Sequence, residues 1–327
     1  MKRWGSWIGL LSLFLVPAVA AAQTGPELML KPWPAGEAEQ GDTQFQVDGQ
    51  VRHSWDGEVE SSDRDFDLTR YDAGGRYRVN AKRGAPAVGY DLTYLDLDTA
   101  SPALPDRLLD TSAAFGFGLG KWQGWSVAGT VGGGFAGDTP FSDDDAWYGK
   151  ANLIANKKID KKRSVYVGLN YDGNRVIWPD VPLPIAAYNE RVSETFRYSL
   201  GVPVSSVQWQ PSDRLTLEAS TVVLVDFSAE ARYRLHEKLI AFAGYDSDTT
   251  AFHRDGGREH RRLFYKTRRL EGGVKLPCPE MPGSEVVIAG GYAFDREFER
   301  GFDVRDLDTV RDVSDSPYIR AAIDFSF

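Results

Sequence analysis

The sequence has a single cysteine, no long apolar run beyond its first residues and no excess of basic residues. Because Cys278 is the only cysteine in 327 residues, no disulfide can form within the chain, and the fold must depend on hydrogen bonds and packing. No later segment approaches about 18 consecutive apolar residues, which excludes a transmembrane helix. The net charge of −9 argues against nucleic-acid binding, which calls for a basic patch. Helical periodicity is nearly absent.

The N-terminus has the pattern of a secretory signal peptide. Lys2 and Arg3 precede an apolar stretch from Trp7 to Val16, and small residues follow up to Ala22. We predict that residues 1–22 are a cleaved signal peptide; a membrane anchor is the alternative, but the apolar run is short. Residues 23–43 are rich in proline, glycine and acids without periodicity, so we predict a flexible leader. The folded domain is then residues 44–327.

From Phe45 to the end, apolar side chains alternate with polar side chains in one segment after another. FQVDGQVRHSW at 45–55 and SPYIRAAIDFSF at 316–327 are typical. A β-strand directs successive side chains to opposite faces, so each segment offers one apolar and one polar face. We count about 12 to 14 such segments, which predicts an all-β chain of antiparallel up-and-down hairpins. The stretch VPVSSVQWQP near residue 200 could be a whole strand or the end of one.

The predicted connections differ in length. Short joints are expected at 120–123, 157–163, 210–213 and 236–238, and longer polar loops at 138–145, 174–190, 246–260 and 298–316. Short turns on one side and long loops on the other are typical of outer-membrane β-barrels. We therefore predict an antiparallel transmembrane β-barrel of about 12 strands (12–14).

Aromatic residues and the C-terminal strand support a barrel in a membrane. Phe45 and Trp55 lie ten residues apart on one face, as do Trp125 and Phe135. At about 3.3 Å per residue and a tilt of about 40°, such a pair spans roughly 25 Å, the height of the apolar band between aromatic girdles. The last apolar face ends in Phe325 and Phe327, similar to the terminal signature that the barrel-assembly machinery reads. The first strand, near residues 45–55, would pair with this last strand and leave no open edge in lipid.

The second half also resembles a known family. The stretches LTLEAS, ARYRLHEKLIAFAGYDS, RRLFYKTRRLEGGV and AGGYAFDREFERGFD are similar to an uncharacterised bacterial family of exported outer-membrane-β-barrel-like proteins that carries the label "domain of unknown function". The resemblance covers roughly residues 45–327 and is strongest in GGYAFDREFERG. It implies a barrel fold and brings no activity, substrate or site residue.

Most of the charge lies on the polar faces, which we predict to line the barrel lumen. The candidate lumen-lining residues are Glu230, Arg232, Arg234, Arg269, Glu271, Lys275, Arg320 and Asp324. They could line a water-filled pore and select solutes, or pair across neighbouring strands and fill the lumen. The mixed signs at close spacing favour pairing, with some of these residues still bordering a narrow channel.

Evidence for an enzyme is weak. His253 and His260 flank a glycine-rich loop segment, and an active site at the extracellular rim would use such residues. The sequence contains no compact Ser/His/Asp motif and no HExxH motif, so we expect no catalytic residues, no metal site and no cofactor. The acidic stretches SDDDA at 142–146 and DLDTVRDVSD at 306–315 could hold divalent cations, but solvated loops are the simpler interpretation.

Together these patterns predict a monomeric outer-membrane barrel with a passive role, either a small-solute channel or a structural component of the envelope. Its expected partners are outer-membrane lipid, lipopolysaccharide and the barrel-assembly machinery, and no nucleic acid. An outer-membrane enzyme at the rim is one alternative. A secreted, carbohydrate-binding β-sandwich is the other, and it would direct the face of Trp125, Val127, Val131 and Phe135 inward to a core.

Overall fold

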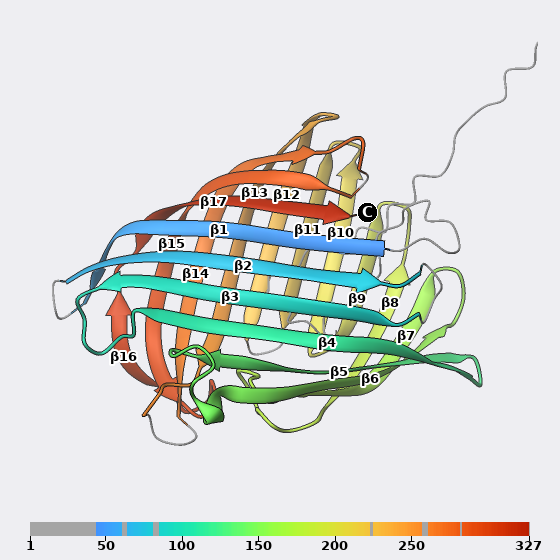
Figure 1. The fold of residues 1–327 in the computed structure, drawn as a ribbon. Helices are drawn as coiled ribbons and strands as arrows, with labels where there is room; N and C mark the ends of the chain where they lie inside the picture. Colours follow the sequence, from blue (N-terminus) through green and yellow to red (C-terminus); the bar gives the residue numbers. More distant parts are fainter. Residues whose placement is uncertain are drawn as a thin grey trace, which may run out of the picture.

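The described part of the chain forms one antiparallel sheet that closes on itself (Figure 1). A computed structural model describes residues 44–60, 64–80, 85–222, 225–256, 261–281 and 283–326. The predicted signal peptide and leader lie outside these residues, as do His260 and Phe327. Among the described residues, no helix has the length and hydrophobicity of a membrane span.

Seventeen strands and one short 3₁₀ turn, η1 (Asp144–Ala146), make up the described fold. The strands are β1 (Gln44–Val59), β2 (Arg64–Arg78), β3 (Ala87–Thr99), β4 (Arg107–Trp122), β5 (Trp125–Gly137), β6 (Trp147–Lys158), β7 (Arg163–Asp172), β8 (Leu183–Arg191), β9 (Phe196–Val202), β10 (Val204–Ser212), β11 (Leu215–Val222), β12 (Asp226–His236), β13 (Leu239–Phe252), β14 (Arg262–Pro277), β15 (Glu285–Gly301), β16 (Asp308–Val313) and β17 (Ser316–Ser326).

Sixteen of these strands, β1 to β15 and β17, pair in sequence order around a closed ring. The last strand closes the ring on the first, with Gln46 opposite Ser326 and Ser54 opposite Tyr318. This closure satisfies the backbone groups of both edge strands, as expected from the alternation at residues 45–55 and 316–327. The remaining strand, β16, lies beyond the ring and pairs with the far end of β15 and with Val59.

The predicted strand number of about 12 is therefore wrong. The additional strands lie mainly between residues 183 and 212, where β8, β9 and β10 follow one another closely. Two prolines prevented these strands from being recognised in the sequence. Pro184 lies inside β8, in a stretch that we expected to be a loop. Pro203 alone separates β9 from β10. Proline usually marks a strand boundary, so these alternations were counted as a loop and a single strand.

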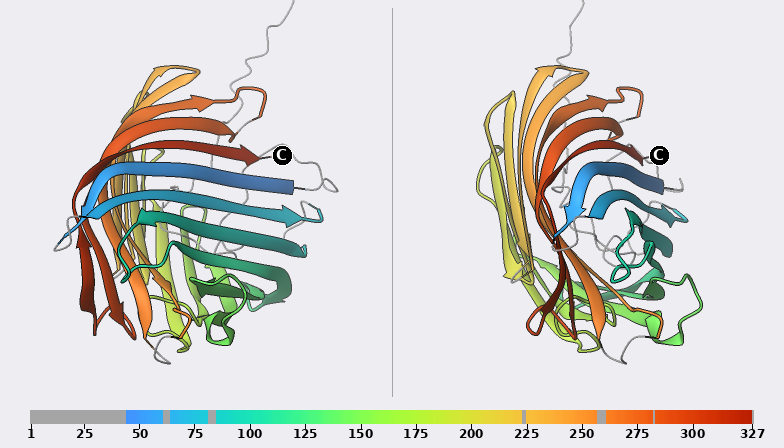
Figure 2. Two further views of the ribbon diagram at one scale, coloured as in Figure 1. Left: turned by 60° about the vertical axis from the view of Figure 1, so that its left-hand side comes forward. Right: turned by 90° about the vertical axis from the view of Figure 1, so that its left-hand side faces the viewer.

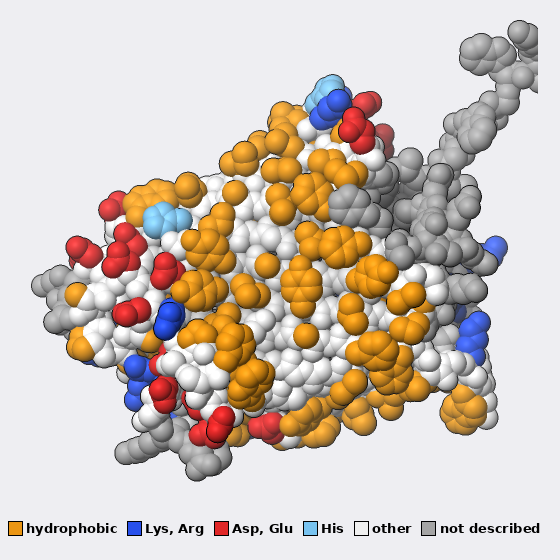
Figure 3. All heavy atoms as spheres, in the orientation of Figure 1, with side chains coloured by type: hydrophobic (Ala, Val, Ile, Leu, Met, Phe, Trp, Pro, Cys, Tyr) orange, Lys and Arg blue, Asp and Glu red, His pale blue; other side chains and the backbone are white. Residues whose placement is uncertain are grey.

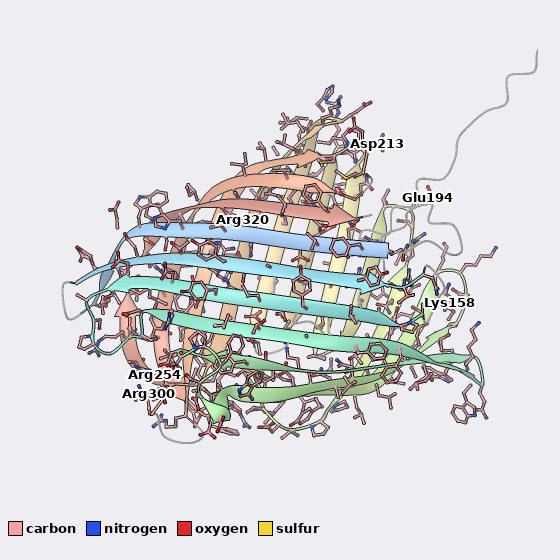
Figure 4. All side chains as sticks on the ribbon, viewed as in Figure 1. Lys158, Glu194, Asp213, Arg254, Arg300 and Arg320 are labelled. Atoms are coloured by element: carbon pink, nitrogen blue, oxygen red, sulfur yellow. The ribbon has the colours of Figure 1, made fainter. Side chains whose placement is uncertain are left out.

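The connections that we predicted to be short and those that we predicted to be long lie at opposite ends of the barrel. The turns 123–124, 159–162, 213–214 and 237–238 lie at one end, called the turn end, and the longer connections 100–106, 138–146, 173–182 and 302–307 lie at the other, the loop end (Figure 2). Figure 4 shows Lys158, Glu194 and Asp213 at the turn end and Arg254 and Arg300 at the loop end. The loops are shorter than predicted because the strands continue into them, for example β8 into the expected loop 174–190.

The outer surface of the ring carries an apolar band between two rows of aromatic side chains. The row nearer the loop end contains Tyr71, Tyr94, Phe135, Trp147, Tyr171, Phe227, Tyr245 and Tyr292, and the row nearer the turn end contains Phe45, Tyr77, Trp125, Tyr188, Tyr198, Trp209, Tyr233 and Phe325. Between them Val131, Leu200, Leu270, Ile288 and Ile319 are more than half exposed. Figure 3 shows hydrophobic side chains spread over this wall, with acidic side chains gathered toward the loop end.

The face of β5 that we predicted to point outward does so, but one of its side chains is covered by neighbouring rings. Val131 is 54% exposed on the outside of β5, but Phe135 is fully buried. The rings of Phe141 and Trp147 lie 5.1 Å and 5.4 Å from the Phe135 ring and cover it. Because the described strands form one closed ring and this face points outward, the β-sandwich alternative is wrong.

Candidate functional site

The candidate site is the interior of the barrel, where the polar faces of the strands meet. The predicted lumen residues lie on β12, β14 and β17, and cross-strand register puts them on one face: Glu230 is opposite Gly244, Gly244 opposite Glu271, and Arg269 opposite Asp246. Arg269 and Lys275 are buried, whereas Arg234 is exposed near the turn end. Asp324 lies opposite Asp48 in the β1–β17 pairing.

These charges form ion pairs between strands that are one or two places apart in the ring. Glu271 Oε1 lies 2.6 Å from Arg320 Nη2, and Lys275 Nζ lies 2.8 Å from Glu230 Oε1. Arg269 Nε donates to Asp246 Oδ2 at 3.0 Å. Within each pair the partners neutralise one another, so this part of the interior is cross-linked by charge-assisted hydrogen bonds. Figure 4 shows Arg320 on β17, midway between the two ends.

Further ion pairs reach across the interior between strands that are not neighbours in the ring. Arg70 on β2 pairs with Asp248 on β13 and, at 2.9 Å, with Asp72 on its own strand. Arg269 Nη2 also approaches Asp248, at 3.7 Å. Thr93 donates to Asp72 at 2.7 Å. The interior between the β1–β5 wall and the β13–β17 wall is therefore filled by paired side chains at this level.

An apolar cluster fills the same half of the barrel nearer the loop end. It joins the β1–β4 wall to the β13–β16 wall and contains Val59, Phe66, Leu68, Leu95, Leu97, Leu104, Leu108, Phe252, Leu263, Tyr265, Phe298 and Val313, all buried. Burial of these side chains stabilises the fold as a soluble protein core does. We call the space enclosed by β1–β5 and β13–β17 the filled half of the lumen.

The other half of the interior is different. Along β7–β12 many inward-facing side chains are half-buried, among them Tyr166, Asn170, Ala187, Asn189, Arg191, Arg197, Ser199, Ser206, Gln208 and Ser228, whereas Glu218 and Ser220 on β11 are buried. Many of them are short, and Ser199 and Ser206 face one another directly. In contrast, Asp91, Thr93, Ser112 and Thr130 on the inner face of β3–β5 are buried. We call the space along β7–β12 the accessible half of the lumen.

The loop at residues 173–182, which we call the cap loop, crosses the loop end of the barrel. Asn174 Nδ2 donates to Asp110 on β4 at 3.2 Å and to the Ala251 carbonyl on β13 at 3.0 Å. Arg262 on β14 donates to Asn174 Oδ1 and to the Arg175 carbonyl, both at 3.0 Å. The cap loop is thus attached to β4, β13 and β14, of which β13 and β14 lie across the ring from it.

A second set of contacts fixes the far part of the cap loop to the connection between β15 and β16. The Val304 amide donates to the Val176 carbonyl at 3.0 Å, and the Trp178 amide donates to Asp303 at 3.3 Å. The Arg305 guanidinium lies 5.1 Å from the centre of the Trp178 ring. Hydrogen bonds from Arg305 and from backbone amides keep the pKa of Asp303 below its usual value, so the carboxylate remains a charged anchor.

His253 and its neighbours join two further loops at this end. The His253 amide donates to the Ala136 carbonyl at 2.9 Å, and Arg254 pairs with Asp138 at 3.4 Å. Burial, and then the nearby Arg262, lower the pKa of His253, so its ring is neutral near pH 7. Its role is that of a loop contact, because no carboxylate or serine of the described chain is hydrogen-bonded to its ring.

Within the described ranges, no group of three or more His, Cys, Asp or Glu side chains is placed to hold a metal ion. Phe325 lies at the turn end opposite Val47, and Phe327 lies outside the described residues.

Sequence reasoning missed the residues that divide the interior. Arg70 and Asp72 lie in an alternating segment, whereas Asp248 lies in the stretch 246–260 that we expected to be a loop and that β13 enters. Their pairing also requires β2 and β13 to approach, which alternation does not reveal. Arg191 and Arg197 were missed because their strands were not recognised. A signal was present in FRYSLGV at 196–202, where Phe, Tyr, Leu and Val alternate with Arg, Ser and Gly.

No protein-family model matches the chain, so the family resemblance of its second half stays an expectation. No curated protein sequence matches it. Among solved structures it is similar to the TodX deltaS2S3 mutant monoaromatic hydrocarbon channel (TM-score 0.43, 10% identity, 93% of this chain and 95% of that chain). It is also similar to the Pseudomonas putida toluene transporter TodX (TM-score 0.43, 10% identity, 92% and 91%) and a Pseudomonas aeruginosa FadL homologue (TM-score 0.39, 11% identity, 86% and 89%). Likeness at this level assigns no function to this chain.

Proposed function

We propose that this chain is an outer-membrane β-barrel that acts as a passive channel for small polar solutes. Two features support its place in a membrane. The closed ladder leaves no open backbone edge toward lipid. The apolar band between the aromatic rows is far larger than the patches that soluble monomers expose, and it has the composition of a lipid-facing surface.

The difference between the two ends of the barrel indicates its orientation in the outer membrane. In outer-membrane barrels the short turns lie in the periplasm and the long loops outside, so we place the turn end in the periplasm and the loop end at the cell surface. The acidic loop end would then meet lipopolysaccharide, and the last strand with Phe327 would meet the barrel-assembly machinery; both partners are part of the proposal.

The accessible half of the lumen is the observation that carries the channel function. A barrel that served only as a scaffold has no need of solvent along one side of its interior, whereas side chains such as Ser199, Ser206 and Asn189 keep solvent contact along β7–β12. Hydroxyl and amide groups on a pore wall exchange hydrogen bonds with passing polar solutes without holding them. The filled half keeps the ring rigid beside this path.

In this proposal the cap loop closes the path at the loop end. Its attachment through Asn174, Arg262 and Val304 consists of a few hydrogen bonds, each with a net worth of about 0.5–1.5 kcal/mol. Such a contact set is weak enough to open and close at equilibrium. We therefore expect brief openings and a low average conductance for the unmodified protein.

Single-channel recording in planar bilayers tests this proposal. Arg262→Ala removes four hydrogen bonds to the cap loop and the Phe302 carbonyl, and should raise the open probability. The opposite variant joins the cap loop to the β15–β16 connection through Val176→Cys and Val304→Cys in a Cys278→Ser background. Oxidation should abolish the openings, and a reducing agent should restore them.

Heat-modifiability on a gel confirms that each variant has folded. If neither Arg262→Ala nor the oxidised double-cysteine variant changes the conductance, the cap loop does not gate the channel. A complete absence of conductance in the wild type, in Arg262→Ala and in the reduced double-cysteine variant would overturn the channel function. A structural role in the envelope, which the filled half already suits, would then be the better account.

A further inference from the structure

Basic side chains gather in two neighbouring turns at the turn end of the barrel. The turn between β6 and β7 and the turn between β4 and β5 supply six exposed cations: Lys121, Lys157, Lys158, Lys161, Lys162 and Arg163. We call residues 121–125 and 157–163 the basic rim, in which Asp160 is the single acid. Figure 4 shows Lys158 at this end, and Figure 3 shows basic side chains on the same edge of the barrel. The basic rim is therefore a local excess of positive charge on a chain whose net charge is −9.

The acids beside the basic rim already have partners. Asp160 accepts hydrogen bonds from two backbone amides of its own turn, both at 2.8 Å, and pairs with the Arg163 guanidinium at 2.6 Å. Glu190 lies opposite Arg163 in the β7–β8 register and accepts from the hydroxyls of Tyr198 at 2.7 Å and Tyr188 at 3.0 Å. These acids balance Arg163, so the charges of the lysines in the basic rim remain in excess.

The basic rim also carries large apolar side chains in contact with its surroundings. Trp122 lies opposite Trp125 in the β4–β5 register and is 67% exposed, and Ile159 is 52% exposed. Lys157 Nζ lies 5.7 Å from the centre of the Trp125 ring, which belongs to the aromatic row at the turn end. Tryptophan rings in such rows lie at the headgroup level of a bilayer. Lys157 is therefore placed at the level of the lipid phosphates.

From this arrangement we propose that the basic rim binds anionic phospholipids, with the lipid phosphates beside its lysines and the upper acyl chains against Trp122 and Ile159. Clusters of lysine at a membrane surface attract anionic headgroups. In the orientation proposed above, the turn end lies at the periplasmic leaflet, which consists of phospholipids. The inference rests on the proposed membrane location and orientation, and it does not depend on the channel being open.

A lipid headgroup fits the basic rim better than a dissolved anion does. Lysine is a point charge on a flexible stem, so exposed lysines do not form a preorganised pocket that would hold a small anion from solution. Exposed charge is also screened over about 8 Å at physiological salt, so the anion must be kept close to the protein by something else. The membrane does this for its own headgroups. Trp122 and Ile159 have no role in binding a dissolved anion, whereas both suit contact with lipid.

Native mass spectrometry of the full chain in detergent micelles tests the inference, with phosphatidylglycerol and phosphatidylcholine as the two lipids. The wild type should bind the first phosphatidylglycerol more tightly than the first phosphatidylcholine. One ammonium roughly 6 Å from a phosphate, at a dielectric constant of about 80, changes an affinity about threefold. The double variant Lys157→Gln with Lys161→Gln should therefore weaken phosphatidylglycerol binding about tenfold and leave phosphatidylcholine binding unchanged. Heat-modifiability on a gel confirms that the variant has folded.

The matched control is Arg214→Gln with Lys238→Gln, which removes two exposed cations from other turns of the same end, each beside an acid, Asp213 or Glu237. It should leave both lipid affinities unchanged.

Three results would overturn the inference while the channel function stands. The first is equal affinity of the wild type for the two lipids, and the second is an equal loss in the two double variants. The third is displacement of phosphatidylglycerol by an equal concentration of glycerol phosphate, which would identify a site for a dissolved anion. A protein that stays in solution without detergent and shows no heat-modifiable species would overturn the membrane location, and with it both proposals.

Discussion

Arg70 on β2 forms an ion pair with Asp248 on β13, and both side chains are at least 94% buried. β2 and β13 are not neighbours in the ring, so this pair joins two walls across the interior. It explains how a sixteen-stranded ring keeps one side of its lumen closed. The barrel resembles a protein core along one half and a solvent-accessible passage along the other.

Removing the negative partner of this pair should destabilise the barrel. Asp248→Asn leaves Arg70 and Arg269 with one carboxylate fewer, and breaking a buried pair typically costs about 3–5 kcal/mol. Asp295→Asn is the matched control: Asp295 pairs with Arg268 at 2.6 Å, both are more than half exposed, and such pairs contribute about 0–1 kcal/mol. Urea titration in lipid vesicles compares the two. If Asp248→Asn and Asp295→Asn lower the free energy of unfolding equally, the interior is not tightly packed at Asp248.

A charge in the middle of the apolar band should be costly. Val131→Arg places a guanidinium at mid-height on the outer wall, where arginine destabilises membrane barrels by about 2–4 kcal/mol. Val79→Arg makes the same change just beyond β2 at the turn end, where about 0–1 kcal/mol is expected. A folding titration into lipid vesicles measures both. If Val131→Arg lowers the folding free energy no more than Val79→Arg does, the apolar band does not face lipid.

The contact between the loop at His253 and Ala136, near the end of β5, should weaken in acid. The pKa of His253 is lowered in the folded state, whereas a detached loop would have a pKa near 6.5. The detached state therefore binds more protons as the pH falls through about 6.5, and the contact loses stability there. Arg262 opposes protonation, and Asp143, Asp145 and Asp180 partly offset it.

Hydrogen exchange of the His253 amide, corrected for the intrinsic pH dependence, reports this change. Protection in the wild type should fall between about pH 7 and pH 5. His253→Gln, which cannot titrate, should show no such fall. A pH-independent protection in the wild type would contradict the assignment of a neutral, buried ring.

Removing Phe327 should impair assembly. The last strand closes the ring on β1, and its apolar face continues through Ile323 and Phe325 toward the terminal residue. Deletion of Phe327 should lower the folded yield in isolated outer membranes, whereas Phe327→Tyr, which keeps an aromatic end, should not. Undiminished yield after deletion would remove the assembly role.

The sequence predicted the faces of the strands better than their number. Alternation placed Val131 and Ile319 outside and Arg269 and Arg320 on the opposite face, because the two-residue period is a local property of each strand. It did not count β8 to β10, where Pro184 and Pro203 interrupt the pattern. The division of the lumen was not predictable, since it depends on contacts such as Arg70 with Asp248 and Asn174 with Ala251, between residues far apart in the chain.

The solvent contact of one half of the lumen is the central claim, and cysteine labelling tests it most directly. In a Cys278→Ser background, Ser199→Cys and Ser206→Cys place thiols on the accessible wall, and Ser112→Cys places one at a buried inward position of the filled half. A charged, membrane-impermeant thiol reagent should label the first two in reconstituted vesicles and leave the third unlabelled. Labelling of none of them, or of all three alike, would contradict a lumen divided into a filled and an accessible half.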